Sequence, residues 1–276
     1  MQKYVIQDKY NSSEIKKIIC FDFDHTFYLK SDCDTKWDLF VTYFVIIKLL
    51  LSTKNGRVFL KNLLDKFNIN VNEFNHNFIN ESKIIQLILN CNHNGNYCVM
   101  AKYILNNFKE QSNYNHYINS LLNYGISFDS IRNAYINTTK FASKYYYKDI
   151  LPNKKLINEF IKLYKQKNKT VILWSDNSEE HIKIGMKILN INDQIINNLI
   201  IVSLFKEKHM NIKRMPNSIN DLKVELYKKS IITNIRDKFN FIVYDDSIDV
   251  LNSLYKQGAN CNIVNNLEIK KYEPQE

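Results

Sequence analysis

The chain has 276 residues, of which 45% are hydrophobic and 13% aromatic, which favours a folded globular protein over a disordered chain. This length fits one large domain, or a core domain that carries an inserted one. The formal net charge of +10 favours acidic partners, such as phosphorylated substrates, nucleic acid or an anionic surface.

The first predicted element is a buried strand at Ile18–Phe21, and the acids Asp22 and Asp24 follow it. Residues 31 to 147 then have the periodicity of helices separated by polar turns. The helices expected in this part are Trp37–Ser52, Arg57–Phe67, Ile84–Leu89, Tyr97–Phe108, Tyr117–Leu122 and Phe128–Ala142.

Further along the chain, predicted strands alternate with predicted helices. The strands are Thr170–Trp174, Leu199–Val202, Phe241–Tyr244 and Cys261–Val264, and the helices are Lys154–Lys165, Glu179–Leu189, Leu222–Arg236 and Ile248–Lys256. This alternation predicts an α/β fold, a Rossmann-like doubly wound parallel sheet with helices on both faces. Because the first strand belongs to the same sheet, we expect a core domain of residues 1–30 and 148–276. Residues 31–147 then form an inserted all-helical domain.

Acidic residues follow two of the predicted strands. Strand side chains repeat every two residues, so Asp22 and Asp24 are expected on the same side. Burying two like charges together is unfavourable unless a metal or a function requires them. In an open parallel sheet the ligand lies beyond the carboxyl ends of the strands. The other polar strand ends are Ser175-Asp176-Asn177, and Asp245-Asp246-Ser247 with Asp249.

Aligned strands bring these acids and hydroxyls to one crevice, where a hard divalent cation such as Mg²⁺ neutralises them through oxygen ligands. A carboxylate that the metal does not fully consume can act as a nucleophile toward phosphorus. A second acid can protonate the leaving group and then deprotonate water. The sequence therefore predicts phosphate chemistry at this edge of the sheet.

The segment Asp22-Phe23-Asp24-His25-Thr26 resembles the DxDxT first motif of the haloacid-dehalogenase-like (HAD) hydrolases. The resemblance continues in order with Leu151-Pro152 before a helix, an apolar run ending in Ser175, a lysine, and the segment 244–249. It spans residues 17–264, apart from the helical insert. The position of that insert resembles the helical cap of the phosphoserine-phosphatase-like branch.

This resemblance implies roles for the acids of the first motif. Asp22 would be the nucleophile that forms an aspartyl-phosphate, and it would also contact Mg²⁺. Asp24 would be the general acid and base, with its backbone carbonyl bound to the metal. Ser175 would hydrogen-bond a phosphoryl oxygen.

The resemblance also implies a lysine that neutralises charge on the phosphoryl group. Lys223 is favoured because it opens the predicted helix that leads into the strand before Asp245. The alternatives are Lys206, Lys208 and Lys228. Asp245 would bind Mg²⁺, with Asp246 or Asp249 completing the shell directly or through water.

Several features have simpler structural interpretations. Ser175 can cap the following helix, Lys223 can be an ordinary exposed lysine, and Asp249 can be a helix N-terminal acid. His25 and Tyr244 stand where the family often has glycine. We expect His25 to alter loop packing, with a leaving-group contact as the alternative, and the Tyr244 ring to narrow the site.

The five cysteines include no CxxC pair, and Cys20 and Cys261 lie in apolar runs, which indicates a reducing compartment. Cys91, His93 and Cys98 have irregular spacing, so no zinc site is expected there.

The N-terminus lacks an apolar segment, so we expect no secretion signal and a cytoplasmic protein. The apolar run 39–51 is too short to span a bilayer, so a buried helix and no membrane partner are expected.

Together these patterns predict a Mg²⁺-dependent phosphatase that hydrolyses a small phosphorylated metabolite through an aspartyl-phosphate. A phosphatase acting on nucleic-acid ends is an alternative that the positive charge motivates, although the lysines are scattered. A catalytically silent HAD-like binding module is another, motivated by His25 and Tyr244. The presence of every required acid argues against it.

Overall fold

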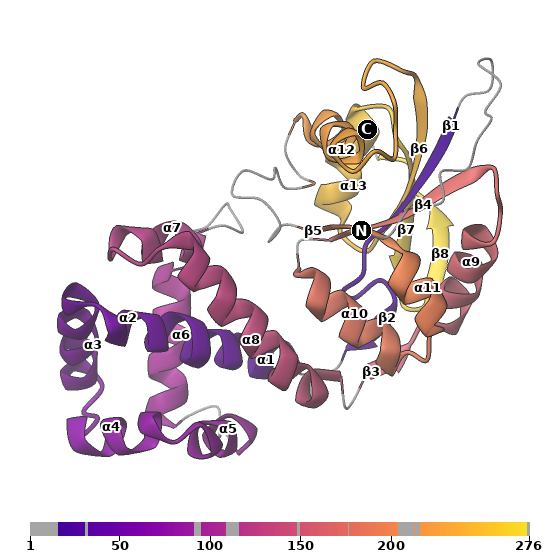
Figure 1. Ribbon diagram of the computed structural model, residues 1–276. Coiled ribbons are helices and arrows are strands. Elements are labelled where there is room, and N and C mark those ends of the chain that lie inside the picture. The colour runs from indigo at the N-terminus through magenta and orange to yellow at the C-terminus, as the bar shows by residue number, and fades with distance from the viewer. Residues whose placement is uncertain are drawn as a thin grey trace.

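The structure is a computed structural model that describes residues 16–30, 33–90, 95–108, 116–147, 150–175, 177–203, 213 and 216–274. Two regions stand side by side, a sheet covered by helices and a block made of helices alone (Figure 1). We call the second region, residues Cys33–Tyr146, the helical block.

Six strands form the main sheet, in the order β5-β4-β1-β6-β7-β8. Neighbouring strands are parallel from β5 to β7, and β8 runs antiparallel to β7 at the edge. The strands are β1 (Lys16–Phe21), β4 (Lys169–Ser175), β5 (Ile200–Ser203), β6 (Phe239–Asp245), β7 (Asn260–Asn265) and β8 (Glu268–Lys271). The α/β Rossmann-like prediction is confirmed, with the correction that the last strand makes the sheet mixed.

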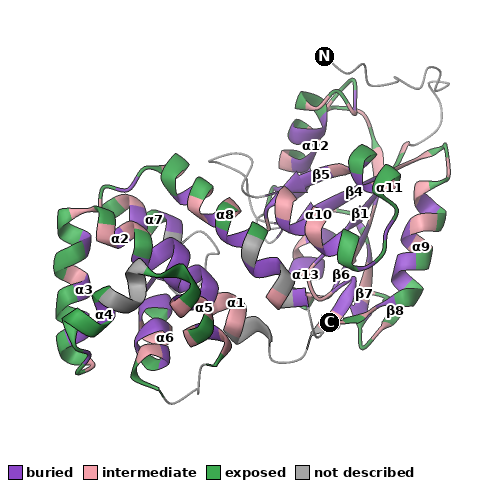
Figure 2. Cartoon of the chain, turned by 60° about the horizontal axis from the view of Figure 1, so that its bottom comes forward, coloured by how far each residue is buried: buried purple, intermediate pink, exposed green. Residues whose placement is uncertain are grey.

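Helices cover both faces of this sheet because its strands carry apolar side chains on both sides. In β1, Ile19 and Phe21 pack toward α9, α10 and α11, whereas Ile18 and Cys20 pack toward α12 and α13. The central strands are accordingly buried (Figure 2). The five helices are α9 (Lys154–Tyr164), α10 (Glu179–Ile188), α11 (Asp193–Asn198), α12 (Ser218–Lys228) and α13 (Ile248–Lys256).

The register of the central strands sets the position of the polar strand ends. Phe21 in β1 lies opposite Leu173 in β4 and Tyr244 in β6. The residues that follow these three positions therefore leave the sheet at one edge. Asp22, Ser175 and Asp245 all lie at this edge.

The helical block has a hydrophobic core of its own, which includes Phe40, Ile46, Leu50, Met100 and Ile104. Its elements are α1 (Cys33–Val41), the π-helix η1 (Thr42–Ile47), α2 (Lys48–Ser52), α3 (Lys54–Lys66), α4 (Val71–Ile79), α5 (Glu81–Leu89), α6 (Asn96–Phe108), α7 (His116–Asn123) and α8 (Phe128–Tyr146).

The chain enters and leaves the helical block through two short strands that pair antiparallel, β2 (Tyr28–Lys30) and β3 (Ile150–Pro152). The last helix of the block, α8, runs back toward the sheet and packs against α10 (Figure 1). This packing places side chains of the block next to the carboxyl ends of the strands.

Several predicted elements need correction. The helix expected at Leu222–Arg236 begins earlier, at Ser218, and ends at Lys228, because the chain then turns through Ser230 with φ of 57°. Helices α4 and α11 and strands β2, β3 and β8 were not predicted.

The apolar run that includes η1 is buried in the core of the helical block, as expected. Within the described ranges, no helix combines the length and hydropathy that crossing a bilayer requires.

The cysteines differ from one another. Cys20 and Cys261 are buried free thiols, and burial raises the pKa of Cys261 to about 12. Cys98 is disulfide-bonded, which contradicts the expectation of reduced cysteines. Cys91 and His93 lie outside the described residues.

Gly185 allows α10 to approach the turn after β1. A Cβ at this position would lie 2.5 Å from Phe23 Cζ and 2.6 Å from the Tyr147 hydroxyl oxygen. We therefore expect Gly185→Ala to lower the free energy of unfolding by about 1–3 kcal/mol, as overpacked cores do. Denaturant unfolding measures this. A gain in stability, which alanine gives in an unobstructed helix, would contradict the close approach.

Candidate active site

A tight turn follows β1 and separates the two acids of the first motif. The Asp22 amide still donates to the Tyr244 carbonyl oxygen at 2.9 Å, but the Phe27 amide already turns back to the Phe23 carbonyl oxygen at 3.0 Å. His25 has φ of 58°, the left-handed conformation that favours glycine. Because the strand ends at Phe21, the two-residue repeat no longer applies to Asp24. The two carboxylates have different hydrogen-bond partners, although the charge of Asp24 still acts on Asp22.

Three acids gather at the ends of β1 and β6. Asp22, Asp245 and Asp246 each offer a carboxylate oxygen, and these oxygens all lie within 4.8 Å of one another. Asp22 and Asp245 are 8% and 1% exposed, whereas Asp246 is half-buried. The Ser247 amide donates to Asp245 Oδ1 at 3.0 Å and fixes that carboxylate at the strand end.

One buried lysine contacts this cluster. Lys213 Nζ lies 2.6 Å from Asp22 Oδ1 and 2.6 Å from Asp245 Oδ2, and the lysine is 3% exposed. Its backbone carbonyl accepts a hydrogen bond from the Ser218 hydroxyl at 3.0 Å, at the first turn of α12. The ammonium group therefore joins the acids of two adjacent strands.

The Thr26 hydroxyl lies between two of the acids. Its Oγ1 is 3.1 Å from Asp22 Oδ2 and 3.2 Å from Asp246 Oδ1. A hydroxyl has one hydrogen and can donate to only one of these oxygens at a time. The carboxylate oxygen that receives no hydrogen from Thr26 then faces the hydroxyl oxygen directly. That contact is favourable only with a further proton or a cation nearby.

The electrostatics of the cluster favour an added cation. Burial raises the pKa of Asp22 well above its usual range, and Asp245 and Asp246 raise it further, against the opposing charge of Lys213. Burial and Asp245 likewise raise the pKa of Asp246. Three carboxylates and one ammonium group leave a formal charge of two negative units. Clustered carboxylate oxygens with this charge suit a hard divalent cation, so the described acids fit a metal site.

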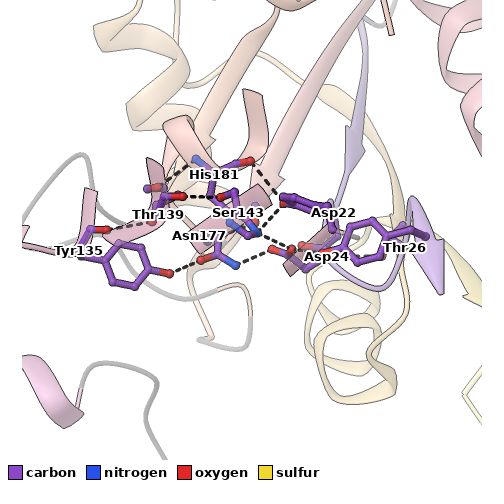
Figure 3. A network of polar contacts seen from close by, with 12 residues as sticks. Asp22, Asp24, Thr26, Tyr135, Thr139, Ser143, Asn177 and His181 are labelled. Atoms are coloured by element: carbon purple, nitrogen blue, oxygen red, sulfur yellow. Dashed lines mark hydrogen bonds and ion pairs between the residues drawn. The ribbon is translucent and has the colours of Figure 1, made fainter. Parts of the chain in front are cut away.

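Asp24 belongs to a second network on the side of the helical block (Figure 3). Its carboxylate accepts a hydrogen bond from the Tyr28 hydroxyl and another from Asn177 Nδ2 at 2.6 Å. The ring of His181 places Nε2 2.9 Å from Asp24 Oδ1. Although burial raises the pKa of Asp24, the charge and hydrogen bond of His181, with the hydrogen bonds of Tyr28 and Asn177, lower it well below its usual range.

The other predicted site residues lie as follows. Ser175 is buried at the end of β4, and its Oγ accepts a hydrogen bond from the Asn177 amide at 3.2 Å. Asp249 is exposed in the first turn of α13, and the described acid cluster does not include it. Tyr244 stacks on Phe21 at a centroid distance of 4.5 Å, so its half-buried ring packs against the core.

The lysine at the site is Lys213, in place of the favoured Lys223. Lys223 Nζ lies over the Phe239 ring, 5.6 Å from its centroid, and Lys228 pairs with Glu225 at 2.8 Å. The alternatives Lys206 and Lys208 lie outside the described residues.

The misplaced helix start explains this error. The predicted helix began at Leu222, which made Lys223 its first lysine, but α12 begins at Ser218. Pro216 precedes that start in the sequence and is the signal that could have placed the loop earlier. The last loop lysine before the helix is then Lys213.

Comparisons with known proteins add one structural similarity to these observations. No protein-family model matches the sequence, and no curated protein matches it. Among solved structures, the chain is similar to the crystal structure of a HAD hydrolase, family IA, variant 3, from Entamoeba histolytica. The identity is 15% and the TM-score 0.39, over 89% of this chain and 82% of that chain. A similarity this low carries no argument about function.

Proposed function

We propose that this protein is a Mg²⁺-dependent phosphatase of the HAD-like type that hydrolyses a small phosphomonoester through an aspartyl-phosphate. The observation that carries the proposal is the position of Asp22, in a buried cluster with Asp245, Asp246 and Lys213 at the carboxyl edge of the sheet. The motif order that resembles the HAD hydrolases supports the same interpretation.

In the first half-reaction, an Asp22 carboxylate oxygen forms a bond to phosphorus while the ester bond to the leaving alcohol breaks. Asp24 donates a proton to the leaving oxygen. Lys213 and Ser175 stabilise the charge that develops on the phosphoryl oxygens. Mg²⁺ held by Asp22, Asp245 and Asp246, with the Asp24 carbonyl, would polarise the phosphoryl group.

In the second half-reaction, water attacks phosphorus and the bond from phosphorus to Asp22 breaks, which releases inorganic phosphate. Asp24 takes the proton from that water, which requires its carboxylate form, and the partners of Asp24 favour that form. The first half-reaction requires its protonated form. A bound phosphate dianion promotes protonation, because like charges disfavour ionisation.

A small substrate is supported by the residues around Asp24. Trp37 from α1 lies 4.9 Å from the His181 ring and Tyr135 from α8 donates to the Asn177 side chain, so the helical block stands directly over this side of the site. We infer that the block acts as a cap domain, residues 31–147, that shields the reaction from water.

Metal dependence provides the direct test. We expect the purified protein to release phosphate from small phosphomonoesters when Mg²⁺ is present. A chelator should lower this rate by at least about 10²-fold, because several kcal/mol of charge stabilisation is lost with the ion. Excess Mg²⁺ should restore it. Far-UV circular dichroism shows whether the chelated protein stays folded, and activity that survives chelation in a folded protein would contradict the proposal.

A further inference from the structure

The Asp24 carboxylate is held by donors from three separate segments. Tyr28 comes from β2, Asn177 from the loop after β4, and His181 from the first turn of α10. Of these, Tyr28 and His181 are completely buried, and the backbone amide of His181 donates to Ser178 Oγ at 3.2 Å. The donors thus belong to elements whose positions the sheet and its helices fix.

A residue of the helical block and the residue that directly follows the block hold two of these donors in turn. The Tyr135 hydroxyl on α8 donates to Asn177 Oδ1, which leaves the amide nitrogen of Asn177 directed at Asp24. Tyr147, directly after α8, has its hydroxyl oxygen 2.8 Å from His181 Nε2 and donates to the His181 carbonyl oxygen at 3.4 Å. The Tyr135 contact runs from α8 to the Asp24 network (Figure 3), and the Tyr147 contact runs from the residue that follows α8.

His181 Nε2 lies 2.9 Å from Asp24 Oδ1 and 2.8 Å from the Tyr147 hydroxyl oxygen, so one ring nitrogen joins the Asp24 carboxyl group to Tyr147. A hydrogen on Nε2 can be donated to the Asp24 oxygen. The Trp37 ring covers His181 at 4.9 Å, which restricts the imidazole to this orientation. Asp22 is held by other partners, Lys213 and the Thr26 hydroxyl, so among the described contacts the hydrogen bonds of this network reach Asp24 and not Asp22.

We propose that His181 and Asn177 are positioning residues for Asp24, and that Tyr135 and Tyr147 at α8 link this positioning to the helical block. The proposal rests on the proposed function. These four side chains keep the Asp24 carboxyl group in place for proton transfer to the leaving oxygen. They do not touch the nucleophile or the acid cluster in the described contacts.

This role has a consequence that a general structural role lacks. An alkoxide is a poor leaving group and needs a proton from Asp24 as the ester bond breaks, whereas nitrophenolate leaves readily without one. Disturbing Asp24 alone should therefore slow the hydrolysis of an alkyl phosphate far more than that of p-nitrophenyl phosphate.

The test compares glycerol 2-phosphate with p-nitrophenyl phosphate, in Mg²⁺, for the wild type and for His181→Phe. We expect kcat for glycerol 2-phosphate to fall by about 10²-fold or more, while kcat for p-nitrophenyl phosphate falls by less than about tenfold. KM should change little, since His181 binds no part of the substrate. His181→Gln keeps an N–H donor and should restore part of the lost rate.

A matched pair of hydroxyl deletions controls for buried tyrosines in general. Tyr147→Phe removes the hydroxyl next to His181 and should show the same selective loss in weaker form. Tyr43→Phe removes a buried hydroxyl that donates to the Tyr97 carbonyl oxygen at 3.0 Å, inside the helical block, and should leave both rates unchanged. If His181→Phe does not fold, Tyr147→Phe and Tyr43→Phe still test whether this network positions Asp24.

Equal losses on both substrates, or no loss on either, would overturn the positioning role while leaving the phosphatase in place. A folded wild type that hydrolyses neither substrate would overturn the proposed function, and the positioning role with it. The two failures are therefore distinguishable.

Discussion

Asp22→Asn is expected to reduce phosphate release by about 10⁴-fold or more, because enzymes that lose their nucleophile lose most of their rate enhancement. The asparagine amide has nearly the size of the carboxyl group, so the turn after β1 can keep its shape. The asparagine amide cannot form the acyl phosphate that water then hydrolyses. Steady-state kinetics in Mg²⁺ measures the loss, and mass spectrometry of the quenched wild type should locate the phosphoryl group on Asp22.

The matched control is Asp65→Asn, because Asp65 is an exposed acid on α3, remote in the fold from the sheet edge. This variant should retain wild-type kinetics. If Asp22→Asn kept a substantial rate in a folded protein, Asp22 would not be the nucleophile. The acid cluster would then need another explanation.

Lys213→Met is expected to have the second largest effect, on both stability and activity. Lys213 is buried between the carboxylates of Asp22 and Asp245, with 2.6 Å to each. Removing one partner of a buried ion pair leaves an uncompensated charge, which destabilises proteins by about 3–5 kcal/mol. Loss of a cation that stabilises developing charge should also lower kcat by about 10²–10³-fold.

The destabilisation should depend on pH in a predictable direction when a chelator is present. Burial already raises the pKa of Asp22, so the folded state holds this proton more tightly than the unfolded state, and stability falls as pH rises. Lys213 opposes that rise in pKa. Without it, the stability deficit of the variant should be larger at neutral pH and smaller in acid, where the carboxyl groups are protonated.

Lys223→Met is the matched control, because this lysine lies over the Phe239 ring away from the acids. A contact of this kind is worth about 0.5–1 kcal/mol at an exposed site, so a small change in stability and an unchanged kcat are expected. The opposite ranking of the two lysine variants would assign the phosphate-binding role to Lys223. Denaturant unfolding measures the stability of both lysine variants, and steady-state kinetics measures their kcat.

Much of the fold follows from local patterns. The apolar runs that became β1, β4 and β6 are short, bounded by polar residues and separated by helical periodicity, so their alternation was sufficient to predict a parallel sheet. The short strands β2 and β3, which form a separate pair, and the edge strand β8 were not predicted because few of their side chains are buried. Their position depends on strand pairing with distant residues, which local periodicity does not record.

The acid cluster was predictable for a related reason. Asp22 and Asp245 each follow a buried strand, and parallel strands in register end at the same edge of a sheet. Sequence order and strand direction therefore bring them together without knowledge of side-chain packing. Asp249 shows the limit of this argument, because one further turn of helix leaves its side chain exposed.

The sequence by itself thus determined the α/β class, the edge of the sheet where the acids meet and the acidic chemistry of that edge. Only the tertiary structure decided that Lys213 contacts the acids, that His181 and Asn177 contact Asp24, and that Tyr135 binds Asn177. These contacts join loops and helices far apart in the chain. Their side chains meet through the packing of α8 on α10 and the path of one loop, which no local pattern encodes.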